Sequence, residues 1–272
     1  MSAAFETAWG VATATGRRSG NEDSFLADPP VFVVADGMGG HEAGEVASAI
    51  VVQEFSDLRG RESIEPEDLF DRIERGAARI RALPAPPGRG AGTTLAGVVL
   101  SSRGGAPYWL VVNIGDSRVY RSADGVLEQV TVDHSEVQEL LDSGELTPTE
   151  ADDYPRRHVV TRAVGAFAQV RPELWMLPAG PNDRMLVCSD GLTGELSDEA
   201  ILELLLTAGS PQQSADALVQ AALAHGGHDN VTVVVVDGRG FDDADATVPS
   251  LTESDDDTHP RGDLDPVAEA TL

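Results

Sequence analysis

The amino-acid sequence predicts an α+β fold, in which helices and strands occupy separate layers. Three observations support this prediction: two helical patterns follow one another in the first third of the chain, apolar runs cluster in the middle, and two helical patterns follow one another near the end. Elements that segregate along a chain in this way pack as layers, whereas regular alternation favours a βαβ repeat. The 272 residues suit one large domain with a tail as well as two small domains.

Short apolar runs predict the strands. Each run is rich in valine and is bounded by Gly, Asp or Pro, which is typical of a buried strand between turns. The runs span residues 31–35, 95–101, 108–114, 118–121, 185–188 and 231–236.

Longer stretches with apolar residues about every 3.6 positions predict the helices. They span residues 44–58, 66–83, 135–143, 197–206 and 211–225, of which Ser197 and Pro211 begin the last two. A further short helix is predicted after Thr147, a typical N-cap, because Pro148 fits the first helical position and Glu150 lies three residues beyond the cap.

Residues 241–272 differ in composition from the rest of the chain. They hold ten acidic residues and one basic residue, Arg261, with no apolar periodicity. Such a segment cannot bury enough apolar surface to offset the entropy of ordering, so we expect it to be disordered. The predicted globular domain therefore spans residues 1–240.

Charge and cysteine content exclude several classes of protein. The chain carries a net charge of −27, and all 19 basic residues are arginine. Nucleic acids and anionic membranes are therefore not expected as partners. The single cysteine, Cys188, excludes a disulfide framework and favours the reducing cytoplasm. The first ten residues lack the basic flank and apolar stretch of a signal peptide, and no apolar run is long enough to span a membrane.

Aspartates recur at the ends of the predicted strands. Asp36, Asp116 and Asp190 each follow an apolar run, and Asp229 precedes another. If the strand ends meet, these carboxylates converge, and like charges in close proximity need compensation. Two interpretations stay open: the aspartates belong to ordinary turns on the surface, or hard divalent cations such as Mg²⁺, Mn²⁺ or Ca²⁺ bind them.

Six short motifs, taken in order, carry a family resemblance. They are RSGNED at 18–23, VADGMGGH at 34–41, GTT at 92–94, NIGDSR at 113–118, SDGL at 189–192 and HDN at 228–230. Together they resemble the motifs of metal-dependent protein serine/threonine phosphatases of the PPM, or protein phosphatase 2C, type, and especially of its bacterial branch. The resemblance covers about residues 5–237.

The resemblance implies both a fold and an activity. The fold would be a four-layer α-β-β-α sandwich, two antiparallel β-sheets flanked by helix pairs. The activity would be hydrolysis of phosphoserine and phosphothreonine in proteins by a hydroxide that bridges two Mn²⁺ or Mg²⁺ ions. Phosphoprotein substrates of Ser/Thr kinases are then the expected partners, and we expect a monomer.

Site residues follow from the resemblance position by position. Asp36 would be shared by the two metal ions, with the carbonyl of Gly37, Asp190 and Asp229 as the other ligands. Glu22 and Asp23 would act mostly through metal-bound water, Asp116 would bind a third, weaker metal, and Arg18 would hold the substrate phosphate. The position after Asp36-Gly37 is Met38, as is usual in bacterial members, whereas eukaryotic members have a His there that is proposed to donate a proton, so the identity of the general acid stays open. We expect His41 to orient its loop.

Residues 134–165 resemble the bacterial flap. We expect His158 and Arg162 to contact the substrate. For Arg156 and Arg157, salt bridges with Asp152 and Asp153 are an equal alternative. The acidic tail would either be inert or compete with the substrate for the arginines of the flap. A non-catalytic phosphoprotein-binding member of the family, a calcium-stabilised structural domain and a phosphatase dedicated to one regulator are the alternatives.

Overall fold

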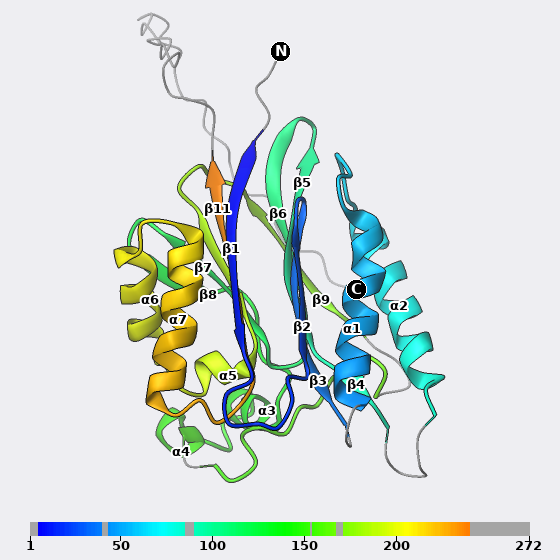
Figure 1. Cartoon of the computed structure of the whole chain (residues 1–272), viewed down its shortest axis with the longest axis vertical. Helices are drawn as coiled ribbons and strands as arrows, with labels where there is room; N and C mark the ends of the chain where they lie inside the picture. The colour runs from blue at the N-terminus through cyan, green and yellow to red at the C-terminus, as the bar shows by residue number, and fades with distance from the viewer. Residues whose placement is uncertain (1–4, 40–42, 85–89, 153, 167–170, 240–272) are drawn as a thin grey trace, which may run out of the picture. The chain divides into compact units, whose positions relative to one another are not determined.

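The computed structural model describes residues 5–39, 43–84, 90–152, 154–166 and 171–239. Two β-sheets pack face to face in it, with a helix pair on each outer face (Figure 1). This confirms the four-layer α+β sandwich. Every strand pair is antiparallel. The predicted tail lies outside the described residues, and the division of the chain at residue 240 stays a prediction.

The first sheet has five strands, which run from one edge to the other in the order β1-β11-β10-β7-β8. Their bounds are β1 Glu6–Ala14, β11 Val231–Arg239, β10 Arg184–Cys188, β7 Arg118–Ala123 and β8 Val126–Gln129. The second sheet follows the order β2-β3-β5-β6-β9, and the short strand β4 pairs with the end of β3. Their bounds are β2 Asp23–Asp28, β3 Val31–Met38, β4 Gly92–Thr93, β5 Leu95–Arg103, β6 Ala106–Ile114 and β9 Glu173–Pro178.

Each helix pair covers one sheet. Helices α1 (Ala43–Phe55) and α2 (Pro66–Arg81) pack on the second sheet, and α6 (Asp198–Thr207) and α7 (Pro211–His225) pack on the first. Helix α2 begins where a capping box forms between Glu65 and Asp68, with Pro66 at its first position. Three shorter helices are α3 (Glu136–Asp142), α4 (Pro148–Asp152) and α5 (Asp190–Thr193).

Alternation along the central strands builds three apolar layers. In β3, Val31 and Val33 face the α1/α2 pair, whereas Phe32 and Val34 face the opposite sheet. Successive side chains of a strand point to opposite faces, so a strand buried on both faces is apolar throughout. The middle layer, between the sheets, includes the fully buried Trp109.

The six strands predicted from the sequence are all present, with ends that differ by a few residues. The predicted helices are present as α1, α2, α3, α6 and α7, and the short helix predicted after Thr147 is α4. The sequence-based prediction missed β1, β2, β8 and β9, which are the four edge strands of the two sheets. It also missed the two-residue β4 and the four-residue α5. Edge strands are half-exposed and mix polar with apolar residues, so a search for continuous valine-rich runs does not detect them.

Asp183 joins the two sheets from a buried position. Its carboxylate accepts hydrogen bonds from Trp109 Nε1 of β6 (2.9 Å) and from Arg121 of β7, and also from the backbone N–H of Gly180 (2.8 Å). Only 3% of its surface is exposed. β6 and β7 belong to different sheets, so this one side chain connects both.

We expect Asp183→Ala to destabilise the fold strongly, because it leaves the partly exposed Arg121 guanidinium and the buried Trp109 N–H without an acceptor. Removing one partner of a fully buried ion pair costs about 3–5 kcal/mol. For this partly buried pair we expect the lower end, about 3 kcal/mol, which lowers Tm by roughly 10 °C for a domain of this size. Thermal unfolding followed by circular dichroism measures the effect. Glu128→Ala on the edge strand β8 is the exposed control and should change Tm little; equal effects of the two variants would contradict the role of Asp183.

Candidate active site

One end of the sandwich gathers the aspartates that the sequence places at strand ends. A cavity of about 630 Å³ opens there. Eight of the ten predicted site residues line it: Arg18, Glu22, Asp36, Gly37, Asp116, His158, Asp190 and Asp229. Asp23 and Arg162 do not line it. The four aspartates therefore do not lie apart on the surface.

Asp36 is held rigidly through its backbone. Its N–H donates to Thr94 Oγ1 (2.9 Å), and its carbonyl accepts from the Thr94 N–H (2.9 Å) and from Thr93 Oγ1 (2.9 Å). Both threonines are almost fully buried. They therefore position the end of β3.

Asp190 and Asp229 approach one another because β10 and β11 are antiparallel neighbours. β10 ends just before Asp190, and β11 begins just after Asp229. Helix α5 packs directly on this junction: a Cβ on Gly191 would lie 2.0 Å from the carbonyl oxygen of Asn230. Only glycine permits this approach.

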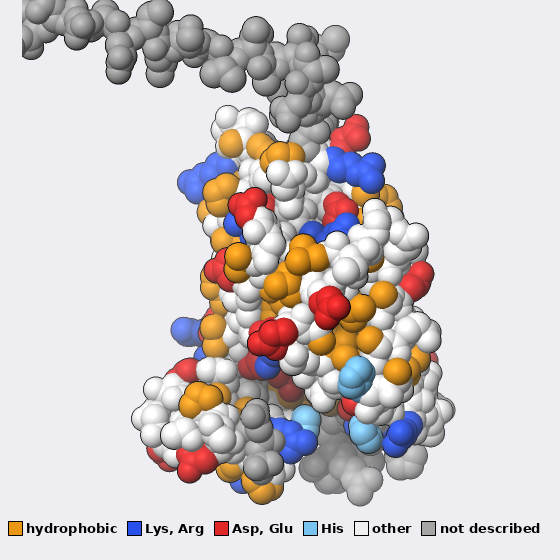
Figure 2. Space-filling view, turned by 90° about the vertical axis from the view of Figure 1, so that its left-hand side faces the viewer, with side chains coloured by type: hydrophobic (Ala, Val, Ile, Leu, Met, Phe, Trp, Pro, Cys, Tyr) orange, Lys and Arg blue, Asp and Glu red, His pale blue; other side chains and the backbone are white. Residues whose placement is uncertain are grey.

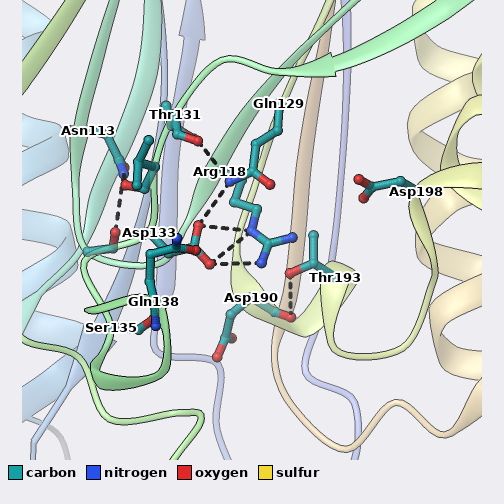
Figure 3. A network of polar contacts seen from close by, with 12 residues as sticks. Asn113, Arg118, Gln129, Thr131, Asp133, Ser135, Gln138, Asp190, Thr193 and Asp198 are labelled. Atoms are coloured by element: carbon teal, nitrogen blue, oxygen red, sulfur yellow. Dashed lines mark hydrogen bonds and ion pairs between the residues drawn. The ribbon is translucent and has the colours of Figure 1, made fainter. Parts of the chain in front are cut away.

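Asp116 lies in the turn between β6 and β7. Gly115 precedes it with a φ of +108°, a conformation that favours glycine. Behind the turn, Arg118 binds Asp133 through Nε (2.9 Å) and Nη2 (2.8 Å). Figure 3 shows this pair within a wider polar network that includes Gln129 and Thr131. The network fixes the strand that carries the Asp116 turn.

The loop that carries Arg18 and Glu22 is bound to the start of β11 by Asn230. The Asn230 side chain donates to the carbonyls of Thr15 and Gly20, both at 2.9 Å, and accepts from the Glu22 N–H at 2.8 Å. In addition, Arg18 Nη2 donates to Asp229 Oδ2 at 2.7 Å.

Asp23 lies behind the cavity, directly opposite Asp36 in the β2–β3 pair. One of its carboxylate oxygens accepts a hydrogen bond from Ser189 Oγ at 2.8 Å. The other oxygen is buried and has no hydrogen-bond partner among the described residues, as is also true of Oδ1 of Asp190. Two buried carboxylate oxygens are thus left without a partner.

Crowding of the carboxylates changes their protonation. Burial, together with the charges of Asp190 and Asp229, raises the pKa of Asp23 to about 7. Burial and the Asp190 charge raise the pKa of Asp116 to about 8. The pKa of Asp36 is raised well above its ordinary value, first by burial and then by Asp190. Without compensation, this cluster therefore takes up protons at neutral pH.

The donor set fits hard divalent cations. All the candidate side-chain ligands are carboxylates, and the orphaned oxygens of Asp23 and Asp190 lack any other partner among the described residues. No three His, Cys, Asp or Glu side chains in the described part of the chain form a ready-made ligand set for one ion. Carboxylate oxygens are the protein ligands that Mg²⁺ and similar ions take, and water commonly completes their coordination.

The flap side of the cavity differs from the prediction in part. His158 lines the cavity, and so does Arg157. Arg162 instead pairs with Glu173 at 2.9 Å, outside the cavity. Arg156 pairs with Glu136 at 2.6 Å. The Asp152 side chain and Asp153 lie outside the described residues, as does His41.

Several cavity residues had no role assigned from the sequence. Glu195 accepts hydrogen bonds from the backbone N–H of His228 (2.8 Å), and its Oε1 lies 2.7 Å from the His228 Nδ1. Both residues line the cavity. Glu195 lies outside every motif, so no sequence signal marked it. Cys188 is fully buried in the apolar layer under α6 and α7, as expected for a core residue.

No helix in the described ranges is long and apolar enough to cross a membrane.

Comparison with known proteins matches the fold and site to one family. The model of the protein phosphatase 2C family matches residues 17–226. The serine/threonine protein phosphatase PstP of Mycobacterium tuberculosis is 41% identical over 230 residues, which cover 83% of this chain but only 43% of PstP. This chain thus spans less than half the length of that relative.

One further relative and one solved structure, the catalytic domain of PstP, match over most of their own length. The serine/threonine phosphatase stp of Listeria monocytogenes is 33% identical over 216 residues, which cover 76% of this chain and 84% of that protein. A crystal structure of the catalytic domain of PstP in complex with two manganese ions superposes with a TM-score of 0.77 at 38% identity, covering 87% of this chain and 100% of that one. From the matched residues, the fold and these relatives, this chain belongs to the protein phosphatase 2C family.

Proposed function

We propose that this protein is a protein serine/threonine phosphatase that hydrolyses phosphoserine and phosphothreonine and depends on Mn²⁺ or Mg²⁺. The observation that carries the proposal is the convergence of Asp36, Asp116, Asp190 and Asp229 on one cavity with Arg18 at its wall. Relatives that are named serine/threonine phosphatases support the reaction. The two manganese ions of the PstP catalytic domain support the choice of metal.

The proposal assigns the metal ligands as follows. Asp36, the carbonyl of Gly37, Asp190 and Asp229 would hold two ions, with Glu22 and Asp23 acting through water, and Asp116 would hold a third ion more weakly. Bound divalent ions lower the pKa of coordinated water and neutralise charge on the phosphate. The orphaned oxygens of Asp23 and Asp190 support this ligand set.

Arg18 would bind the phosphate group of the substrate. Its guanidinium offers a planar pair of donors that matches two phosphate oxygens. The side chain is 59% exposed and is held by Asp229 alone among the described residues, so it can turn toward a phosphate without breaking a buried network. Met38 also lines the cavity and has no proton to donate, so another group must protonate the leaving oxygen.

Phosphoproteins of Ser/Thr kinases are the proposed substrates, with a monomer in the cytoplasm as the proposed form and location. The names of the relatives support the substrate class, and the single, buried cysteine supports the reducing location.

Metal removal tests the proposed reaction. We expect hydrolysis of p-nitrophenyl phosphate with millimolar MnCl₂, none in excess EDTA, and a loss of roughly 10²–10³-fold in Asp36→Asn, because the metal ions supply several kcal/mol of charge stabilisation. Initial rates of nitrophenol release measure this. Full activity in EDTA, or an unimpaired Asp36→Asn variant, would count against the proposal.

Stability of the metal-free protein should fall as pH rises. The raised pKa values of Asp23 (about 7) and Asp116 (about 8) mean that the folded state binds more protons than the unfolded chain above about pH 4. Protonation of these two carboxyl groups favours the folded state at low pH, and this contribution to stability is lost as pH rises through their folded-state pKa values. In EDTA, Tm at about pH 8.5 should be lower than at about pH 5.5, and MnCl₂ should restore it.

Asp116→Asn isolates this effect. Its Tm should depend less on pH in EDTA than the Tm of the wild type, whereas Asp142→Asn on the exposed helix α3 should behave like the wild type. The same pH dependence in all three proteins would show that the carboxylate cluster does not control stability.

Substitution of Arg18 tests phosphate binding. Hydrogen bonds to charged groups contribute about 1.5–3 kcal/mol, so Arg18→Ala should lower kcat/KM for p-nitrophenyl phosphate by roughly 10- to 150-fold. Arg18→Lys should recover only part of this loss, since lysine lacks the planar fork. Full activity of Arg18→Ala would remove Arg18 from the phosphate site.

A further inference from the structure

Two adjacent arginines on the flap side of the cavity have different surroundings. Arg156 is paired with Glu136, at 2.6 Å. Arg157 lines the cavity, and its guanidinium makes no ion pair or hydrogen bond with any residue in the described ranges. Two neighbouring arginines thus differ: Arg156 is paired with a carboxylate, whereas Arg157 lines the cavity without a carboxylate partner among the described residues.

The backbone around Arg157 is well anchored. The Arg157 N–H donates to the carbonyl of Tyr154 (3.2 Å), and the Val159 N–H donates to the carbonyl of Arg156 (3.0 Å). Tyr154 also donates from its hydroxyl to Glu136 at 2.6 Å. These bonds tie the turn to the start of α3, so Arg157 projects from a fixed position at the rim.

The other arginine that lines the cavity already has an anionic neighbour, because Arg18 binds Asp229. The rest of the chain is strongly acidic, with a net charge of −27. In Figure 2, Arg and His side chains lie at the lower end of the face shown, the end that carries α5 in Figure 1. A negatively charged peptide is repelled by most of this protein, and Arg157 offers it a local attraction.

We propose that Arg157 is a specificity-determining residue that favours phosphopeptides with an Asp or Glu close to the phosphorylated residue. The proposal rests on the proposed phosphatase function. While Arg18 holds the phosphate, the guanidinium of Arg157 pairs with the neighbouring carboxylate of the substrate. Arg157 takes no part in the reaction itself, so its effect is on substrate binding.

The test compares three kinds of substrate with the full chain in MnCl₂. These are p-nitrophenyl phosphate, a phosphothreonine peptide with only neutral flanking residues, and peptides in which one neutral residue within three positions on either side is replaced by Glu. An exposed ion pair is worth a factor of about two to five, so at least one Glu peptide should exceed the neutral peptide by this factor in kcat/KM, through KM. The preference should shrink at high salt.

Arg157→Gln and Arg156→Gln form a matched pair of variants, with the same change of charge at neighbouring positions. Arg157→Gln should lose the preference for the Glu peptide and keep its activity on p-nitrophenyl phosphate. Arg156→Gln should keep the preference. A preference that persists in Arg157→Gln overturns the proposal, as does a wild-type protein without any preference.

Two other outcomes are distinguishable. Equal losses of Arg157→Gln on all three substrates would assign Arg157 to the phosphate itself and overturn the proposal. If the wild type hydrolyses nothing, the proposed function fails, and fluorescence anisotropy with labelled neutral and Glu phosphopeptides then decides the role of Arg157 separately. Tighter binding of the Glu peptide by wild type but not by Arg157→Gln would support it, and equal binding would overturn it.

Discussion

Repulsion among aspartates that share one cavity is the constraint on which the rest of the structure depends. Burial and mutual charge raise the pKa values of Asp23, Asp36, Asp116 and Asp190 together. Without a rigid backbone to hold them, repulsion between their charges would move these carboxylates apart. They stay together because each is carried by backbone that is fixed elsewhere, such as the end of β3, which Thr93 and Thr94 hold.

The strands of the sandwich provide this fixed backbone. β10 and β11 are antiparallel neighbours, so the end of β10 lies beside the beginning of β11, although helices α5, α6 and α7 separate the two strands in the sequence. β3 and β6 end near the same place in the opposite sheet (Figure 1). Alternating apolar side chains bury both faces of these central strands, which makes them the most rigid supports available for a strained cluster of charges.

Sequence patterns predicted the interior of this fold much better than its margins. Strands such as β3 and β11 are buried on both faces and therefore appear as continuous apolar runs, whereas edge strands such as β1 carry mixed residues that resemble a loop. The site followed the same rule. Most of the predicted site residues inside the ordered motifs line one cavity, with Asp23 as an exception. Glu195 and the contrast between Arg156 and Arg157 depend on contacts between distant segments, which no local pattern records. Arg162 was assigned to the substrate from its motif, and its partner Glu173 lies in a strand that the sequence did not reveal.

The position of Asp183 affects how the two sheets respond to charge repulsion at the cavity. Asp183 precedes β10, at the opposite end of that strand from Asp190, and there it binds Trp109 of one sheet and Arg121 of the other. The two sheets are thus joined at the end remote from the cavity. This link and the apolar layer between the sheets together oppose any separation of the sheets in response to charge repulsion at the cavity. Uptake and release of cations should therefore be accommodated within the loops at the cavity, while the sandwich behind them keeps its shape.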